Sequence, residues 1–533
     1  MTDINKSTVI SSVLSADSST ERNASNITTI LRTQFNPTLA FTCLLLICSS
    51  FSHGFDNQGF ATIQAMDSFA EQFGDYNKLT HSYAIPSFFL SYLNSFQYIG
   101  FGFGLTLGSY VSSVFGRKWC IRSMSAYALV TATTAVTSKA REQILAARVL
   151  NYIFIGMEMA VIPVFQAEIT PADARGFMVG AFQLSLNIGG LIIHVITNAT
   201  ANREDSSAWR IPVGLFFVFP ALIGTLINLI PESPRWLLAH SREKEAMDSL
   251  KKFRSGKFTD LQILEEFKEI EISLKETEKN TGSYLDLFKG TNSTRTLIVI
   301  GINVFQQITG QAFASQYGTI YIKSLGTVNA FQMSIVSAVV SIVGVILSLI
   351  LNDRYGRKTF LYMGLLGQSA ALMTMGGLGT SKTVTKEMKN GIVAMMNIFS
   401  FSFSFGYAPL CYVVSSEIPT LRLRDKTYRI GMLVNILFAF LVAFTLPYLL
   451  NAGYANLQSK VGFIYGAFSV LGLIFTCFMV PECYGKSLEE IDFCFDKKIP
   501  LRKFGSYNVR ESPEYVHFTE SYKSSLANKE EKD

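Results

Sequence analysis

The chain has 533 residues, of which 49% are hydrophobic, 13% are aromatic and 16% are charged, and its mean hydropathy is +0.28. Because a soluble protein carries about a quarter charged residues, this composition argues against a soluble globular protein and favours a membrane protein. The formal net charge of +6 gives little support to a nucleic-acid partner.

Apolar stretches recur along the chain at the length, about 20 residues, that crosses a hydrocarbon core of about 30 Å. They predict an all-α membrane protein with twelve transmembrane helices. The predicted spans are residues 39–63, 86–111, 119–138, 143–167, 176–198, 210–230, 294–322, 328–351, 358–378, 391–415, 427–450 and 460–480.

Polar segments divide the chain into five regions. The first is rich in Ser, Thr and Asn and lacks the apolar stretch of a signal peptide, so it is predicted to be disordered. The central one contains two amphipathic segments, "SREKEAMDSLKKFRSG" and "LQILEEFKEIEISLKETEK". The regions are a cytosolic arm (1–37), a six-helix half (38–234), a cytosolic linker with short helices (235–293), a second six-helix half (294–480) and a cytosolic tail (481–533).

The distribution of Lys and Arg predicts the orientation in the membrane. Short loops on one side carry most of these residues, as the positive-inside rule requires of cytosolic loops. Both termini are then cytosolic, and the positive charge is explained by topology. The short inner loops hold Arg117, Lys118, Arg122, Arg175, Arg354, Arg357, Lys358, Arg422, Arg424, Lys426 and Arg429.

The chain repeats three features in one order at nearly one spacing, which indicates two related halves. "FGRK" at 115–118 returns as "YGRK" at 355–358, and "PES" at 231 returns as "PEC" at 481. A glutamate followed seven residues later by an arginine occurs at 168 and again at 417. The offsets are 240, 250 and 249 residues.

The repeated charged groups lie at the predicted inner ends of the spans. They are interpreted as a gate, whose members bridge spans and separate when the cytosolic side opens; the alternative is a topology signal with surface salt bridges worth less than about 1 kcal/mol each. The second half has Asp353 and Arg354 where the first has Ser113 and Val114, so the first copy is expected to be weaker. The predicted gating residues are Glu168, Arg175, Asp353, Arg354, Arg357, Glu417 and Arg424.

A set of motifs in both halves points to a known family. The motifs are Gly54-Phe55-Asp56, Gly116-Arg117-Lys118, Arg148, "EITPADARG" (168–176), Gln183, "PESPRWLL" (231–238), "QQITG" (306–310), "DRYGRK" (353–358), "EIPTLRLR" (417–424) and "PECYGKSLEEID" (481–492). From about residue 38 to 492 the chain resembles the sugar porter family of the major facilitator superfamily, and its fungal branch most. The resemblance implies the major facilitator fold, with two pseudo-symmetric six-helix halves that rock about a midplane site.

Uncharged polar groups within the spans suit a sugar, because amides both donate to and accept from hydroxyls and aromatic rings cover C–H surfaces. Gln307 and Gln311 are expected to share one face of the seventh span. The resemblance implies sugar contacts at Gln183, Gln306, Gln307 and Asn435; the alternative is that such amides only join helices. The sequence departs from the family at two positions: Ala312 stands where an asparagine is usual, with Gln316 one turn further along, and Tyr412 stands where tryptophan is common. Gln316 and Tyr412 complete the predicted sugar site.

Asp56 lies within the first span, where an aspartate costs about 2.5–3.5 kcal/mol on insertion scales. The resemblance pairs it with Arg148 of the fourth span, and proton binding to Asp56 would then weaken the pair and shift a two-state element. The alternative is a static buried ion pair that fixes helix packing. Glu158 is a second acid within the fourth span, and its role is left open among a proton site, a partner for a polar neighbour and a pocket residue.

The resulting hypothesis is a carbohydrate:proton symporter that imports a hexose or a small oligosaccharide across the plasma membrane. The alternatives are a facilitative uniporter and a nutrient sensor. The sequence offers no nucleotide-binding loop, metal-ligand spacing or nucleophile–base set, so neither an enzyme nor a cofactor is predicted. The expected partners are the sugar, the proton and the lipid bilayer, without an obligate protein partner.

Overall fold

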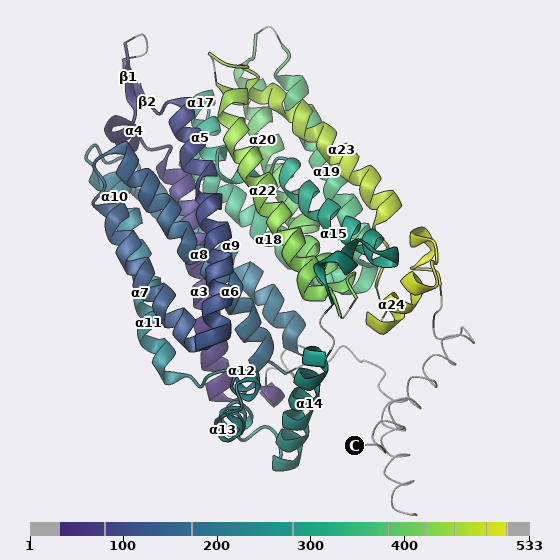
Figure 1. Ribbon diagram of the computed structural model, residues 1–533. Coiled ribbons are helices and arrows are strands. Elements are labelled where there is room, and N and C mark those ends of the chain that lie inside the picture. Colours follow the sequence, from purple (N-terminus) through teal and green to yellow (C-terminus); the bar gives the residue numbers. More distant parts are fainter. Residues whose placement is uncertain are drawn as a thin grey trace, which may run out of the picture.

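The computed structural model describes residues 32–507 and 509, apart from 79–80, 172–173, 280–281, 382, 421, 452, 485 and 487. Two helical bundles stand side by side, one coloured purple to blue and the other teal to yellow (Figure 1). Short helices lie below them at one end. The predicted disordered arm, up to residue 31, and most of the tail lie outside the described residues.

The first bundle contains the helices of the six spans predicted for residues 38–234. Asn36 starts it: its side-chain oxygen accepts a hydrogen bond from the Leu39 N–H at 2.8 Å, which caps the first helix. The elements are α3 (Pro37–Ile63), α4 (Asp67–Phe73), β1 (Asp75–Asn77), β2 (Ser82–Ala84), α5 (Ser87–Ser95), α6 (Gln97–Phe115), α7 (Arg117–Val136), α8 (Arg141–Ile169), α9 (Arg175–Thr200), α10 (Ser207–Gly214), η2 (Leu215–Phe217), α11 (Val218–Leu226) and η3 (Ile227–Leu229). The two strands form an antiparallel hairpin in which Tyr76 pairs with Tyr83.

The second bundle repeats this arrangement. Its elements are α15 (Gly290–Ile308), α16 (Gln311–Ser315), α17 (Gly318–Leu325), α18 (Ala330–Tyr355), α19 (Arg357–Leu378), α20 (Lys386–Ser402), the π-helical turn η5 (Phe403–Tyr407), α21 (Ala408–Glu417), α22 (Arg424–Leu450), η6 (Gln458–Lys460) and α23 (Val461–Met479).

The short helices belong to the predicted linker and tail. The two amphipathic segments of the linker form α13 (Glu243–Arg254) and α14 (Asp260–Lys279). The Asn36 amide donates to the Lys252 carbonyl oxygen at 2.8 Å and so joins α13 to the start of α3. The remaining elements are α12 (Pro234–Ala239), η4 (Tyr284–Phe288), α24 (Leu488–Asp496) and η7 (Leu501–Lys503).

Ten of the predicted spans correspond to helices that are long and apolar enough to cross a membrane. The other two predicted spans, at 119–138 and 358–378, are also helical, as α7 and α19, with 20 and 22 residues. Both helices begin with Arg-Lys directly after a glycine. All twelve predicted spans are thus helical in the part of the chain that the structure describes.

The seventh span differs from the prediction because it is broken. α15 ends at Ile308, and Gly310 adopts a φ of 99°, a left-handed conformation that favours glycine and ends a helix. Gln311 begins the separate helix α16. The prediction that Gln307 and Gln311 share one helix face was therefore wrong.

Glycines allow neighbouring helices to touch backbone to backbone. A Cβ atom at Gly54 of α3 would overlap the Leu186 carbonyl oxygen of α9, and one at Gly104 of α6 would overlap the Ile153 carbonyl oxygen of α8. Small residues at such crossings are typical of membrane helices, whose association depends on close packing. These crossings hold α3, α6, α8 and α9 together around the middle of the first bundle.

We expect Gly104→Ala to lower the apparent melting temperature, because α6 has to move away from α8; overpacking of this kind costs about 1–3 kcal/mol. Gly102→Ala is the matched control, since a Cβ atom there would meet Ile436 Cγ2 at 4.0 Å, an ordinary van der Waals distance. Thermal unfolding of both purified variants, followed by gel filtration, checks this. Equal melting temperatures would contradict the close α6–α8 contact.

Candidate functional site

Asp56 and Arg148 form a buried ion pair in the middle of the first bundle. The Arg148 Nη1 donates to Asp56 Oδ1 at 2.6 Å, and the side chains are only 6% and 4% exposed. The Asn151 amide donates to the other oxygen, Oδ2, also at 2.6 Å. Both oxygens of the Asp56 carboxylate therefore accept a hydrogen bond, which compensates for the loss of water around this charge.

The guanidinium of Arg148 is equally well surrounded. Its Nε donates to Gln97 Oε1 at 2.9 Å, and its Nη2 donates to the Tyr152 hydroxyl at 3.3 Å. The ring of Phe60 lies 4.1 Å from the guanidinium carbon, within the range of a cation–π interaction. The Tyr152 hydroxyl in turn donates to Asn57 Oδ1 at 2.8 Å. The predicted pair is thus part of a hydrogen-bonded network that joins α3, α6 and α8.

Three of the predicted sugar-binding amides meet in the second bundle. Asn435 of α22 donates to Gln306 Oε1 at 2.6 Å and accepts from the Gln307 amide at 3.0 Å. Within the part of the chain that the structure describes, Gln307 Oε1 is buried without a hydrogen-bond partner. The cluster therefore retains an acceptor that a hydroxyl group could satisfy.

Gln316 links this region to the first bundle. Its amide donates to the Tyr98 hydroxyl of α6 at 2.7 Å, and its own carbonyl oxygen is buried without a partner among the described residues. The Tyr98 ring contacts the Tyr152 ring edge to face, with centroids 6.3 Å apart. Tyr98 thus lies between the ion-pair network and the second bundle.

Tyr412 and Gln183 are placed differently. Gln306 faces the Tyr412 hydroxyl from the neighbouring helix, so Tyr412 adjoins the amide cluster. Gln183 is half-buried on α9 of the first bundle, and within the described residues its side chain has no hydrogen bond to the other five predicted sugar-binding residues. The structure brings together Gln306, Gln307, Tyr412 and Asn435; Gln316 approaches through Tyr98 and Gln183 stands apart.

Polar contacts cross between the bundles at the predicted outer end, where α3 finishes. Lys323 of α17 donates to the Ala65 carbonyl oxygen at 2.7 Å and pairs with Asp67 of α4 at 2.6 Å. The Ser91 hydroxyl of α5 donates to the Phe444 carbonyl oxygen of α22, also at 2.6 Å. These contacts hold α17 and α22 of the second bundle against the first.

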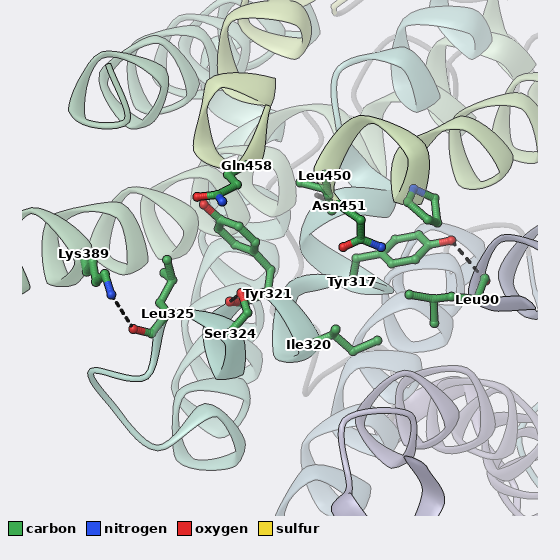
Figure 2. A pocket seen from close by; sticks show the side chains of 11 residues that line it. Leu90, Tyr317, Ile320, Tyr321, Ser324, Leu325, Lys389, Leu450, Asn451 and Gln458 are labelled. Atoms are coloured by element: carbon green, nitrogen blue, oxygen red, sulfur yellow. Dashed lines mark hydrogen bonds between the residues drawn. The ribbon is translucent and has the colours of Figure 1, made fainter. Parts of the chain in front are cut away.

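A cavity of about 360 Å³ lies beside α17 at this end. Figure 2 shows Tyr317 and Tyr321 near Asn451 and Gln458, with Lys389 on one flank. None of the predicted sugar-binding residues lines it. The cavity is therefore separate from the amide cluster.

The predicted inner end of the first bundle carries a closely bonded charged cluster. Arg117 donates to Glu168 through Nη2 at 2.7 Å and through Nε at 3.0 Å. Glu232, from "PES", accepts from the backbone N–H groups of Arg117 and Lys118 at 3.1 and 3.0 Å and so caps α7. Burial raises the pKa of the Glu232 carboxyl, against the effect of these N–H groups.

The second bundle repeats this cluster. Arg357 pairs with Glu417 at 3.1 Å, and Glu482, from "PEC", accepts from the backbone N–H groups of Arg357 and Lys358 at 3.2 and 2.9 Å. The glycine before each cluster has a positive φ, 100° at Gly116 and 88° at Gly356. The three repeated sequence features thus meet at one place in each half.

The predicted gating residues are only partly placed by the structure. The side chains of Arg175, Asp353 and Arg354 lie outside the described residues, and Arg424 begins α22, near Asp492 of α24. In the first copy Arg117 makes a two-point contact with Glu168, which also accepts from the Ser233 hydroxyl at 2.6 Å. The expectation of a weaker first copy stays a prediction, because it rests on the side chains of Asp353 and Arg354.

Sequence reasoning missed several members of these clusters. Asn151 and Tyr152 follow Arg148 by three and four residues, so a search of its helix face could have found them. Gln97 and Tyr98 carried no such signal, because they contact Arg148 and Gln316 across helices. The glutamates of "PES" and "PEC" were noticed as repeats, but their role as helix caps follows from the structure alone.

Comparison with known proteins agrees with this architecture. A family model described as "Sugar (and other) transporter" matches residues 42–495. The major facilitator-type transporter ecdD of Aspergillus rugulosus is 29% identical over 453 residues, which cover 82% of this chain and 84% of that protein. The high glucose sensor RGT2 of Saccharomyces cerevisiae is 30% identical over 426 residues, which cover 78% of this chain and 56% of that protein.

The structure also resembles a solved transporter. The proton:xylose symporter XylE of E. coli, bound to 6-bromo-6-deoxy-D-glucose, matches with a TM-score of 0.69 at 22% identity, over 86% of this chain and 99% of that chain. At this identity the likeness establishes the fold, two six-helix halves of the major facilitator type. Since the family model spans both halves and the charged clusters repeated in them, the chain belongs to the sugar (and other) transporter family of the major facilitator superfamily.

Proposed function

We propose that the chain is a carbohydrate:proton symporter that imports a sugar, a hexose or a small oligosaccharide, across the plasma membrane by alternating access. The observation that carries the proposal is the buried pair of Asp56 and Arg148. A charge within a membrane span that faces the protein interior, with a fixed partner, is a mark of an ion or proton pathway.

Asp56 is suited to exchange a proton for its partner. While it is ionised, Arg148 and Asn151 bind its two oxygens. Protonation removes the charge that holds Arg148 and leaves α3 and α8 with a weaker connection, so the balance between two arrangements of these helices shifts. XylE, which has the same fold, is a proton:xylose symporter, and this supports a proton-binding role for Asp56.

The amide cluster is suited to bind a sugar. Gln306, Gln307 and Asn435 form an uncharged hydrogen-bonded group, and Gln307 retains a buried acceptor. Tyr412 adds an aromatic side chain with a hydroxyl group. Neutral donors and acceptors beside an aromatic ring suit a ligand with many hydroxyls.

Tyr98 and Gln316 supply the connection that coupling requires. Tyr98 is in van der Waals reach of the Tyr152 ring on one side and hydrogen-bonded to Gln316 on the other. Gln316 directly follows α16, the short helix after the break in the seventh span. A sugar hydroxyl that donates to its free side-chain carbonyl oxygen would therefore act on the contact between the two halves. Sugar binding and the ion pair would then bias the same movement.

A receptor is the second candidate, since the high glucose sensor RGT2 is among the relatives. A facilitative uniporter is the third and differs only in the role of Asp56. Transport measurements separate the three: a sensor moves no sugar, a uniporter moves it without protons, and a symporter moves both.

We expect Asp56→Asn to abolish proton-driven accumulation, because an amide cannot bind and release the proton. One charge moving through about 100 mV is worth about 2.3 kcal/mol, or roughly fortyfold accumulation. The variant should equilibrate sugar instead, with an accumulation ratio of about one. External pH in a weak buffer and labelled-sugar uptake are recorded in cells without their own hexose carriers, with glucose, galactose, xylose, maltose, lactose, glycerol and quinate added singly.

Glu71→Gln, at an exposed acid on α4, is the control and should behave as the wild type. Alkalinisation that persists in Asp56→Asn would remove Asp56 from the proton pathway. If an uncoupler did not lower the rate of sugar uptake by the wild type, the protein would be a uniporter. The absence of uptake for every sugar, with the protein at the cell surface, would favour the receptor.

We expect Asn435→Ala to raise the KM for the transported sugar about tenfold or more, because Gln306 and Gln307 lose their shared partner and a buried amide left unpaired costs about 1–3 kcal/mol. Gln332→Ala, at an exposed position on α18, should leave the KM unchanged. Initial uptake rates over a range of sugar concentrations give both values. An unchanged KM in Asn435→Ala would move the sugar site elsewhere.

A further inference from the structure

Glu158 is a second acid in the interior of the first bundle. It lies on α8 and is 0% exposed. The Ser49 hydroxyl of α3 faces it, yet neither carboxyl oxygen of Glu158 nor the Ser49 oxygen has a hydrogen bond of ordinary length and angle within the part of the chain that the structure describes. Glu158 therefore lacks the partners that Asp56 has.

The surroundings of Glu158 are apolar. Its neighbours along α8, Met157 and Val161, belong to a buried hydrophobic cluster that also includes Leu45 and Leu46 of α3. On the other side, a Cβ atom at Gly108 of α6 would come within 2.6 Å of Met157 Cα, so the helices are in close contact here. An ionised carboxylate without a partner in such a place is far more costly than a neutral carboxylic acid. These surroundings therefore favour the neutral form of the Glu158 carboxyl group over the ionised form.

The position of Glu158 along the membrane is defined by two helices. It lies ten residues after Arg148 and ten before Glu168, which corresponds to about 15 Å in each direction at 1.5 Å per residue. Ser49, which faces it, lies seven residues before Asp56, or about 10 Å along α3. α3 and α8 run in opposite directions, so both displacements lead from the ion pair toward the predicted inner end.

Few ionisable groups approach Glu158 from the helices that pack against α8. α3 brings Asp56, whose charge acts on Glu158, and His53 between Asp56 and Ser49. α6 brings the backbone at Gly104 and Gly108. The ionisable side chain of α9 over residues 180–200 is His194, near the predicted outer end.

α7, the fourth neighbouring helix, contributes a thiol and an inner-end charge. Cys120 donates to the Gly108 carbonyl oxygen at 3.6 Å, and Arg117 is engaged by Glu168. On α8 itself Arg148 is engaged by Asp56. Both neighbouring arginines thus have carboxylate partners of their own. Arg148 lies ten residues, or almost three turns, from Glu158 along α8.

From these observations we infer that Glu158 is a second proton-binding site, on the inner side of the pair formed by Asp56 and Arg148, which holds a proton in the present conformation and exchanges it as the helices move. The inference rests on the proposed symport and extends it, because Glu158 gives the proton an intermediate binding site between the midplane and the cytosol. Binding neutralises one negative charge, and release toward the inner end restores it. Water that enters between α3 and α8 is the carrier over the distance of about 10 Å to Asp56.

Infrared spectra of the purified full chain in lipid nanodiscs test this inference without any sugar. A protonated carboxyl group gives a carbonyl stretching band apart from those of carboxylates and amides. We expect a band at neutral pH in the wild type, in Glu142→Gln at an exposed acid of the same helix, and in Asp56→Asn. The band should be absent in Glu158→Gln.

Transfer into D₂O then shows whether water reaches the Glu158 proton while the helices stay folded, as a transport role requires, or only when they unfold. We expect the Glu158 band to shift before the backbone amides of the helices exchange, because a site on a proton pathway is reached by water during ordinary opening. A band that shifts only with those amides would overturn the inference, as would spectra in which Glu158→Gln equals the wild type. If the glutamine variant does not purify as a single species, Glu158→Asp replaces it and should displace the band, since it moves the carboxyl group by one methylene.

The result is separable from that of the proposed function. Proton-driven uptake would support the symporter. If the Glu158 band were then absent, or shifted in D₂O only with the backbone amides, the second proton site would be rejected and the symporter would remain. An exchanging Glu158 band without proton-driven uptake would reject the symporter and leave a buried acid in contact with water.

Discussion

The first bundle is organised by the need to bury one positive and one negative charge without leaving either unsatisfied. Asp56 accepts a hydrogen bond from Asn151 of α8, and Arg148 donates to Gln97 of α6 and Tyr152 of α8. Since a buried charge that loses its partner costs several kcal/mol, these helices have little freedom to slide independently. The contact of Gly104 with the α8 backbone brings α6 close to α8, the two helices that the hydrogen bond from Arg148 to Gln97 joins.

The two halves share their inner ends and differ in the middle. Each inner end has a glycine with positive φ, an arginine paired with a glutamate, and a second glutamate that caps the helix. Between these ends, the first half carries the ion pair of Asp56 and Arg148, and the second carries the uncharged cluster of Gln306, Gln307 and Asn435. The repeated sequence features therefore correspond to a repeated structure at the inner ends, whereas the middle of each half has its own chemistry.

The features of the fold and the site that the sequence predicts are those encoded by residues close together in the chain. Contacts between residues far apart in the chain were not predicted by such local patterns. The spans and the repeat were predicted, because hydropathy and motif spacing are local signals, and the pairing of Asp56 with Arg148 was implied by the resemblance to the sugar porters. The break at Gly310 was not, since residues 294–322 are long enough for one uninterrupted span and a single glycine does not by itself end a helix. The hydrogen bond from Gln316 to Tyr98 joins residues that are 218 positions apart, and no sequence pattern around either residue predicts it.

The contrast between Asp56 and Glu158 follows from the same constraint. Both are carboxyl groups in the interface of α3 with α8, but two donors bind Asp56 and none of ordinary geometry binds Glu158 among the described residues. The hydrogen bonds compensate the Asp56 carboxylate for the water that it has lost, whereas an ionised Glu158 would have no such compensation. A movement that separates α3 from α8 would break the bonds of Asp56 and open the surroundings of Glu158 at the same time. The packing of these two helices therefore governs the environment of both acids together.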